Sequence, residues 1–163
     1  MIVVVMGVSG AGKTTIGQAL AATLEAEFAE GDIYHPAANI EKMRRGEALD
    51  DTDRAPWLAA LAGEIGRWQA EGRAVVLACS ALRESYRRTL GIDHDRVRLV
   101  YLRGAEELIR ARIARRQHGY MPASLLASQF AALEEPREAI TVDITASPVV
   151  IVQRIVARLR SGA

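Results

Sequence analysis

The sequence has little cysteine, little lysine and no excess of charge of one sign. Of its 163 residues one is cysteine, Cys79, which cannot form an internal disulfide, so a disulfide-stabilised secreted scaffold is excluded. We expect a reduced thiol in a reducing, cytoplasmic compartment, and Cys79 as a small buried hydrophobic residue rather than a nucleophile. The 21 basic and 20 acidic residues leave a net charge of +1, which argues against a nucleic-acid partner.

Long hydrophobic runs are also missing. The apolar run at residues 2–6 has no basic segment before it and is followed at once by a glycine. It is too short for a membrane span and lacks the flanks of a signal peptide, so we expect no membrane partner. We find no repeat, low-complexity tract or linker, and we expect a single domain over residues 1–163.

Short apolar runs alternate along the chain with longer segments of helical period. This alternation predicts an α/β fold of three layers with a mostly parallel, five-stranded sheet. Ligands bind such sheets beyond the carboxyl ends of the strands. The predicted strands are residues 2–6, 28–30, 74–79, 97–102 and 140–144. The predicted helices are residues 14–26, 36–45, 56–71, 81–90 and 105–117, and a last one that Ser147 caps and Pro148 opens.

A phosphate-binding motif follows the first predicted strand. The segment GVSGAGKT matches the pattern G-x-x-x-x-G-K-[ST] between a strand and a helix, which predicts a nucleoside triphosphate site. Its glycines let backbone N–H groups approach phosphate oxygens. Lys13 would reach the β- and γ-phosphates, and the Thr14 hydroxyl would bind Mg²⁺. The residues expected to hold the nucleotide are Gly7, Val8, Ser9, Gly10, Ala11, Gly12, Lys13, Thr14 and Thr15.

The acidic residue nearest to this motif is expected to be Asp32. Many proteins with this motif place a carboxylate at the end of a neighbouring strand, but the strand at 74–79 ends in Cys79-Ser80. Asp32 follows the short strand at 28–30, where its carboxylate could orient an acceptor hydroxyl. Taken alone, Gly31-Asp32 is also a common turn pair, which favours a turn or helix-capping role.

Four blocks carry a resemblance to a known family. They are GVSGAGKT, GDIYHPAANIEKMRRGEALDDTDRAPWL, CSALRESYRRTL and MPASLLASQFAALEEP, all between residues 6 and 136. In this order they resemble the small P-loop gluconokinases, relatives of shikimate kinase and the nucleoside monophosphate kinases. The resemblance implies a P-loop kinase fold with a helical lid at about residues 115–135. It also implies transfer of phosphate from ATP to the 6-hydroxyl of D-gluconate, with Mg²⁺, by a homodimer.

The second block supplies three site residues by this resemblance. Asp32 would accept the proton of the gluconate 6-hydroxyl, and His35 would line the sugar-acid pocket. Arg54 resembles the carboxylate-binding arginine of shikimate kinase, since a guanidinium can hold a carboxylate by two parallel hydrogen bonds. Taken alone, His35 is more often a loop residue, Trp57 a core residue, and Arg54 a surface residue paired with an acid. The acidic neighbours of Arg54 are Asp50, Asp51 and Asp53.

The third block adds two further substrate residues, Ser80 and Arg83. Ser80 directly follows the strand at 74–79, where a helix opens and backbone N–H groups could meet the substrate. Arg83 stands where the family commonly has lysine. The positive charge is kept but the shape differs, so a contact there is less strongly implied.

The predicted lid follows a helix that is rich in arginine. Such a run is often a solvated face, but Arg112 and Arg116 lie four residues apart and share one side. By the resemblance, Arg112 would stack on adenine and Arg116 would contact the transferred phosphoryl group. The segment His118-Gly119-Tyr120 departs from the Gly-His-Phe of the family, which weakens a role for His118 and leaves Gly119 as a hinge.

Two other functions compete with a gluconate kinase. One is a kinase for another small acceptor, such as shikimate or a nucleotide; His35-Pro36 and the block at 50–58 argue against both acceptors. The other is a regulatory protein that binds ATP without transferring phosphate. The set of Lys13, Thr14, Asp32 and lid arginines favours catalysis, because a binding protein does not need a carboxylate that faces an acceptor.

Overall fold

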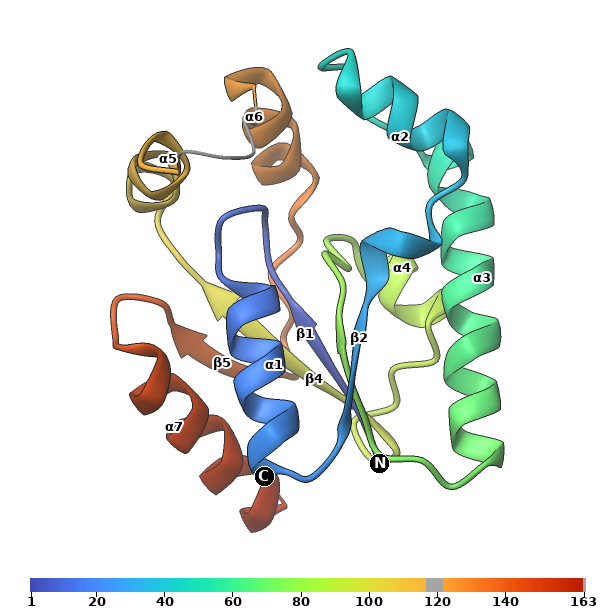
Figure 1. Ribbon diagram of the computed structural model, residues 1–163, viewed down its shortest axis with the longest axis vertical. Helices are drawn as coiled ribbons and strands as arrows, with labels where there is room; N and C mark the ends of the chain where they lie inside the picture. The colour runs from blue at the N-terminus through green and yellow to red at the C-terminus, as the bar shows by residue number, and fades with distance from the viewer. Residues whose placement is uncertain (117–121, 163) are drawn as a thin grey trace.

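The fold is built on one parallel sheet. The computed structural model describes residues 1–116 and 122–162, and in them five strands pair in the order β2-β3-β1-β4-β5 (Figure 1). All four strand pairs are parallel, so the predicted fold class is confirmed. The strands are β1 (Ile2–Met6), β2 (Glu27–Glu30), β3 (Val75–Ala78), β4 (Val97–Arg103) and β5 (Ile140–Asp143).

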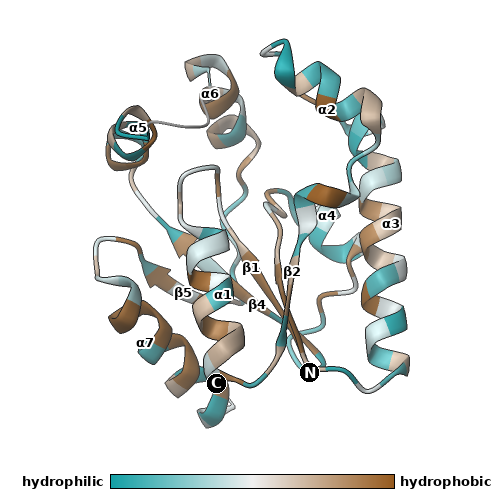
Figure 2. Cartoon of the chain, in the orientation of Figure 1, coloured by the Kyte–Doolittle hydropathy of each residue, from teal (hydrophilic) through white to brown (hydrophobic). Residues whose placement is uncertain are grey.

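The central position of β1 explains its uninterrupted apolar sequence. Val4 pairs in register with Leu77 of β3 and with Leu99 of β4, and every residue of β1 is buried. A strand that helices cover on both faces has no solvent side for polar residues, so alternation is lost. Figure 2 shows the central strands as mainly hydrophobic, whereas the helices carry hydrophilic and hydrophobic residues along their length.

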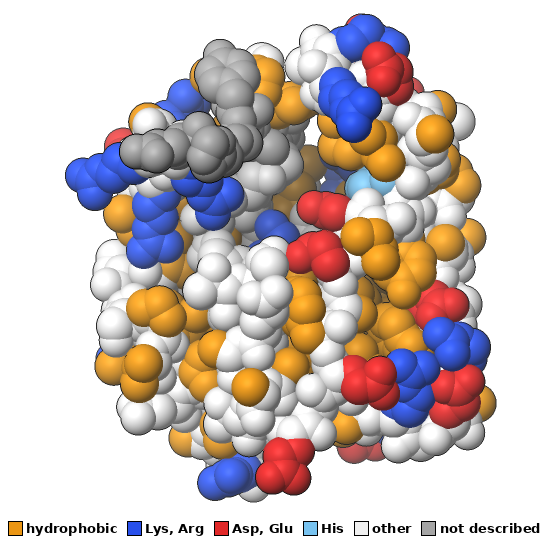
Figure 3. Space-filling model, in the orientation of Figure 1, with side chains coloured by type: hydrophobic (Ala, Val, Ile, Leu, Met, Phe, Trp, Pro, Cys, Tyr) orange, Lys and Arg blue, Asp and Glu red, His pale blue; other side chains and the backbone are white. Residues whose placement is uncertain are grey.

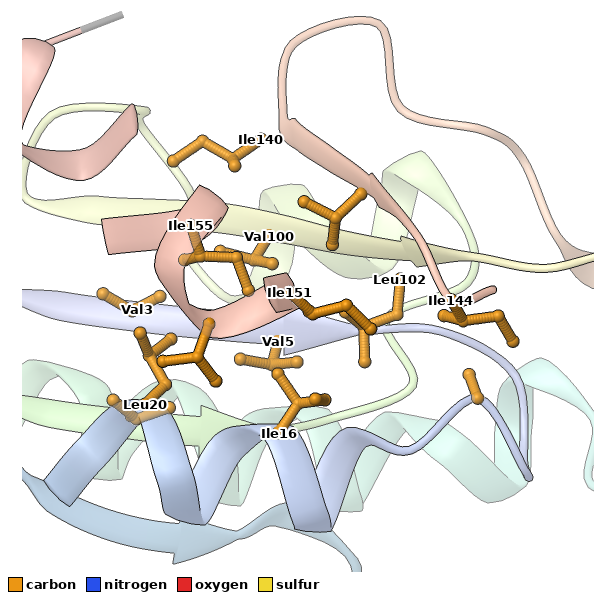
Figure 4. Close-up of a cluster of buried hydrophobic side chains, with 14 of the residues drawn as sticks. Val3, Val5, Ile16, Leu20, Val100, Leu102, Ile140, Ile144, Ile151 and Ile155 are labelled. Carbon is orange, nitrogen blue, oxygen red and sulfur yellow. The ribbon is translucent and has the colours of Figure 1, made fainter. Parts of the chain in front are cut away.

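Helices cover both faces of the sheet (Figure 1). On one face, α1 and α7 pack over Val3 and Val5, and the cluster includes Leu20 and Ile155 (Figure 4). On the other face, α3 and α4 pack over a second cluster that includes Trp57. The helices are α1 (Lys13–Thr23), a 3₁₀ turn η1 (Gly31–Tyr34), α2 (Ala37–Arg44), α3 (Asp51–Ala70), α4 (Glu84–Thr89), α5 (Glu106–Ala114), α6 (Ala123–Ala132) and α7 (Pro148–Ser161). Among the residues described, no helix is long and apolar enough to cross a bilayer.

The start of α7 agrees with its prediction. The hydroxyl of Ser147 accepts a hydrogen bond from the backbone N–H of Val150 at 3.4 Å, and Pro148 is the first helical residue. Proline suits this position because an N–H in the first turn has no partner within the helix.

The predicted start of the helix at 56–71 is wrong by five residues, because α3 begins at Asp51. Asp50 accepts from the backbone N–H of Asp53 at 2.8 Å, and the Asp53 carboxylate accepts from the N–H of Asp50 at 2.9 Å. This reciprocal capping box satisfies two N–H groups of the first turn. Pro56 therefore lies inside the helix rather than at its start.

Other helix ends also differ from the prediction. The helix predicted at 81–90 begins only at Glu84, because Ala81 adopts a left-handed conformation with φ 44°. The helix predicted at 14–26 ends at Thr23, with Leu24 as its C-cap. The one predicted at 105–117 ends at Ala114, and residue 117 lies outside the described residues.

Candidate active site

The phosphate-binding motif forms the turn between β1 and α1. Gly12 caps α1 in a left-handed conformation with φ 98°, which disfavours any residue with a side chain. The backbone of Gly10 lies against α5, where a Cβ atom would come within 2.9 Å of the Ile113 side chain. Within the turn, the ammonium of Lys13 donates a hydrogen bond to the carbonyl oxygen of Val8 at 3.1 Å. The strand–turn–helix context that the motif requires is therefore present.

The half-buried ammonium of Lys13 lies in a mixed electrostatic environment. Burial lowers its pKa, because desolvation disfavours the charged form. Asp32 and Glu30 act in the opposite direction, and Arg116 lowers the pKa further. Residues from the motif, from the end of β2 and the turn after it, and from the end of α5 thus interact at one edge of the sheet.

Cys79 is buried at the end of β3. Burial raises the pKa of its thiol to about 12, so the thiol stays protonated at neutral pH. The prediction of a buried hydrophobic residue is confirmed.

Glu30 is a further candidate site residue, which was not predicted from the sequence. Its carboxylate accepts a hydrogen bond from the Thr14 hydroxyl at 2.6 Å. A signal was available, since Glu30 ends β2 beside the motif, two residues before Asp32. Hydroxyl and carboxylate oxygens are both suitable ligands for Mg²⁺, and in kinases the ion takes its other ligands from water and phosphate. No group of three or more His, Cys, Asp or Glu side chains that could hold a metal occurs within residues 1–116 and 122–162.

Asp32 lies in η1, directly after β2, and is exposed. Its backbone carbonyl accepts from the N–H of His35 at 3.3 Å, which closes the 3₁₀ turn. In the described residues its carboxylate caps no helix. The backbone of Asp32 therefore forms the turn, and its carboxylate faces solvent at the edge of the sheet where Lys13 lies.

His35 is held by an aromatic ring and an amide. Its imidazole stacks on the indole of Trp57, with 4.3 Å between ring centroids and 15° between planes. The Trp57 N–H donates to the carbonyl of Gly31 at 2.9 Å, which ties the stack to η1. The side-chain amide of Asn39, on α2, lies 3.2 Å from Nδ1 of His35. His35 is thus a fixed side chain rather than a free loop residue, and Trp57 belongs to the core as well as to this contact.

Arg54 of α3 contacts an aromatic side chain rather than the acids beside it. Its guanidinium donates to the Tyr86 hydroxyl at 2.9 Å and lies 5.5 Å from the ring centroid. That hydroxyl in turn donates to Asp51 at 2.5 Å. Asp53 pairs with Lys42 at 2.6 Å, and Asp50 caps the helix. No ion pair between Arg54 and these three acids occurs in the described part of the chain, so the surface-pair interpretation is not supported.

Ser80 and Arg83 lie between β3 and α4. Ser80 is half-buried directly after the strand, and Arg83 is the N-cap residue of α4. The Nε of Arg83 is buried and has no hydrogen-bond partner among the residues that the structure describes. An unpaired buried donor of this kind is unfavourable, and an acceptor atom beside it would relieve the cost.

The helices α5 and α6 approach the motif from the other side. Arg112 donates to the carbonyl of Ile144, after β5, at 2.6 Å, and Arg116 is exposed beyond the end of α5. Gln129 of α6 accepts from the backbone N–H of Ser9 at 2.7 Å, a contact that the sequence analysis missed. It joins residues 120 positions apart, which no local pattern reveals. His118 and Gly119 lie outside the described residues.

The site residues therefore converge on one edge of the molecule. Figure 3 shows basic, acidic and histidine side chains around the hollow between α6 and α2. The structure brings together the phosphate motif, an acidic segment after β2 and a group of polar side chains from α2, α3 and α4. Such a site can hold an anionic group at the motif and a polar acceptor beside it.

Comparisons with known proteins agree with this geometry. A family model described as an AAA domain matches residues 2–140, and the chain belongs to that family. A gluconokinase from Gluconobacter oxydans is 47% identical over 133 residues, which are 82% of this chain and 75% of that protein. The chain is a member of the gluconokinase family.

Solved structures extend the likeness over nearly the whole chain. A gluconokinase from Sinorhizobium meliloti superposes with a TM-score of 0.86 at 39% identity, over 98% of this chain and 91% of that one. Shikimate kinase from Aquifex aeolicus superposes with a TM-score of 0.62 at 17% identity, over 99% of this chain and 95% of that one, which shows a shared fold alone. The predicted resemblance to gluconokinases, within a fold shared with shikimate kinase, is confirmed.

Proposed function

We propose that this protein transfers the γ-phosphoryl group of ATP to the 6-hydroxyl of D-gluconate, giving 6-phospho-D-gluconate and ADP. The observation that carries the proposal is the glycine-rich turn between β1 and α1 with Lys13 at its end, together with the exposed carboxylate of Asp32, whose charge raises the pKa of Lys13 at the same edge of the sheet. Membership of the gluconokinase family supports the choice of acceptor.

The nucleotide would bind along the turn of residues 7–15. Backbone N–H groups of the turn and the start of α1 would hold the phosphates, and Lys13 would contact the β- and γ-phosphates. The phosphate charge would also offset the cost of burying the Lys13 ammonium. Thr14 would bind Mg²⁺, and its hydrogen bond to Glu30 sets the orientation of the hydroxyl before the ion arrives. When bound, Mg²⁺ neutralises charge that develops on the phosphate oxygens.

Asp32 would act on the acceptor. Its carboxylate would take the proton of the gluconate 6-hydroxyl while the hydroxyl oxygen forms its bond to the γ-phosphorus. The bond between that phosphorus and the bridging oxygen breaks, and the electron pair leaves with ADP. The exposed carboxylate beside Lys13 supports this role, because the proton acceptor must lie next to the transferred group.

The remaining polar side chains would bind the sugar acid. Arg54, held in place by Tyr86, would take the carboxylate, and His35 would face the hydroxyl groups. Ser80 and Arg83 would line the same pocket, and an acceptor atom of the substrate would relieve the unpaired Nε of Arg83. These residues come from the loop after η1, from α3 and from the β3–α4 loop, which supports a small polar acceptor.

The segment at about 115–135 would act as a lid. Arg112 would stack on adenine near the carbonyl of Ile144, and Arg116 would contact the transferred phosphoryl group. The effect of Arg116 on Lys13 supports the second role, since it requires the two cations to lie near one another. The contact between Gln129 and Ser9 joins α6, which lies within this segment, to the phosphate motif.

Assembly and location complete the proposal. We propose a homodimer in the cytoplasm, within one domain over residues 1–163. Light scattering of the purified protein measures its mass, and a mass of one chain, 17.7 kDa, would exclude the dimer.

The function is tested with purified protein, ATP, Mg²⁺ and a panel of sugar acids, shikimate and nucleotides. We expect ADP release that depends on gluconate, with phosphate on the 6-hydroxyl of the product. Turnover with another acceptor, and none with gluconate, would reassign the substrate. ATP binding without turnover on any acceptor would favour a regulatory protein.

A conservative change at Arg54 tests the carboxylate contact. Arg54→Lys keeps the charge but loses the planar pair of donors, and it also loses the geometry of the contact with Tyr86. We expect the gluconate KM to rise about five- to tenfold, with a smaller change in kcat, because the contact acts mainly in the ground state. Steady-state kinetics with varied gluconate measure the split, and an unchanged KM would return Arg54 to a surface role.

A further inference from the structure

The only asparagine of the chain, Asn39, is buried beside His35 of the candidate acceptor site. It lies on α2, is 4% exposed, and has no role in the proposal above. Its Nδ2 donates to the backbone carbonyl of Asp53, at the start of α3, at 2.8 Å. The same Nδ2 lies 3.2 Å from Nδ1 of His35. One side-chain amide thus joins α2 to α3 and to the loop that carries the histidine.

These two contacts determine which nitrogen of His35 carries the proton. A carbonyl oxygen can only accept, so the amide atom that faces Asp53 is the nitrogen and not the oxygen. The second hydrogen of that NH₂ group is then available to Nδ1 of His35. A ring nitrogen that accepts a hydrogen bond presents a lone pair, so in the neutral imidazole the proton is on Nε2.

Other neighbours fix the ring and keep it neutral. The stack on Trp57 sets the plane of the ring, and Asn39 sets its rotation within that plane. Burial lowers the pKa of His35, with Arg54 acting in the same direction and Asp32 against it. Within residues 1–116 and 122–162, no group forms a hydrogen bond with Nε2, so this edge of the ring is left for a ligand.

We infer that Asn39 is a positioning residue that holds His35 as its Nε2–H tautomer, so that a neutral N–H donor faces a hydroxyl oxygen of the acceptor. The inference rests on the proposed function, because the acceptor is taken to be a sugar acid. The donor would select substrates by the hydroxyl group that it meets, since an acceptor without this oxygen leaves the N–H unpaired. Arg54, rather than His35, would bind the carboxylate of the substrate.

The tautomer is measured directly on the unmodified protein. Long-range ¹H–¹⁵N spectra of the ¹⁵N-labelled chain at neutral pH distinguish protonated from unprotonated ring nitrogens, and His35→Gln identifies the His35 signals by their loss. We expect a protonated Nε2 and an unprotonated Nδ1 in the absence of substrate. A proton on Nδ1, alone or together with Nε2, would overturn the inference.

The role of Asn39 is tested by Asn39→Asp, with Gln69→Glu as the matched control. Both replace an amide by a carboxylate, but Gln69 is exposed near the far end of α3. Aspartate can accept but not donate, so His35 should gain a proton on Nδ1. The gluconate KM should then rise about tenfold while the ATP KM changes less than twofold. The control should change neither constant.

The outcomes separate the two proposals. A raised gluconate KM with Nε2–H retained in Asn39→Asp would show that Asn39 acts through packing alone, and would overturn its positioning role. If the unmodified protein is inactive with gluconate, the proposed function fails, whereas the tautomer spectrum still decides the state of His35. If Asn39→Asp does not fold, the spectrum of the unmodified protein decides that state by itself.

Discussion

Lys13→Ala is expected to lower kcat for gluconate phosphorylation by about 10²–10³-fold, the loss typical when one preorganised charge donor is removed from a transition state. Negative charge moves onto the bridging and γ-phosphate oxygens as the phosphoryl group is transferred, and the Lys13 ammonium would lie against it. Water that enters the space left by the side chain cannot replace the positive charge of the ammonium. ATP affinity should also fall, because the same ammonium contacts the phosphates in the ground state.

The variant should still fold. The hydrogen bond from Lys13 to Val8 joins neighbouring residues of one turn, and burial of the ammonium without phosphate is itself unfavourable. Arg67→Ala is the matched control, because it removes a positive charge that pairs with Glu64 and Glu71 on the surface of α3. Steady-state kinetics and thermal unfolding are compared for both. A Lys13 variant that keeps more than about a tenth of the activity would contradict a transition-state role.

The strands were predicted well because each one carries its own signal. A strand such as β1 or β3, covered on both faces, must be apolar throughout, and this requirement is visible in a few consecutive residues. The position of the candidate site could also be predicted from a short segment, since a glycine-rich turn after a parallel strand lies at the carboxyl edge of the sheet.

Helix starts were predicted less well where a cap or a backbone conformation decides them. The first turn of α3 depends on two aspartates that cap one another, and the proline that drew the prediction lies beyond them. The late start of α4 depends on the left-handed Ala81, a conformation that alanine rarely adopts and that no sequence signal indicates. Both cases show a local preference overridden by a specific contact or by tertiary packing.

The supporting residues of the site were missed for a different reason. Tyr86 meets Arg54 across 32 residues, and Gln129 meets Ser9 across 120. Contacts of this kind exist only after the sheet has brought the ends of the strands together. The sequence therefore indicated candidate residues with reactive groups, whereas the contacts that hold these side chains became visible only in the fold.

Asp32→Asn is the second large effect that we expect, a fall in kcat of about 10²–10⁴-fold, the usual contribution of a general base. Asparagine has nearly the same shape but cannot take the proton of the acceptor hydroxyl. The backbone bond that closes η1, from the N–H of His35 to the carbonyl of Asp32, is unaffected by the change. The ATP KM should therefore change little, and the gluconate KM should change less than kcat.

The control for this variant is Asp95→Asn, the same chemical change in an exposed loop before β4, at the opposite edge of the sheet. It should leave both kinetic constants unchanged. If Asp32→Asn loses ATP affinity in parallel with turnover, the carboxylate acts on the nucleotide or its ion instead of the acceptor. Glu30 accepts a hydrogen bond from the Thr14 hydroxyl at 2.6 Å, so a second carboxylate is already present beside the proposed nucleotide site. The two acids would thus have separate roles: Glu30, at the end of β2, would orient the hydroxyl that binds Mg²⁺, and Asp32, in η1, would act on the acceptor.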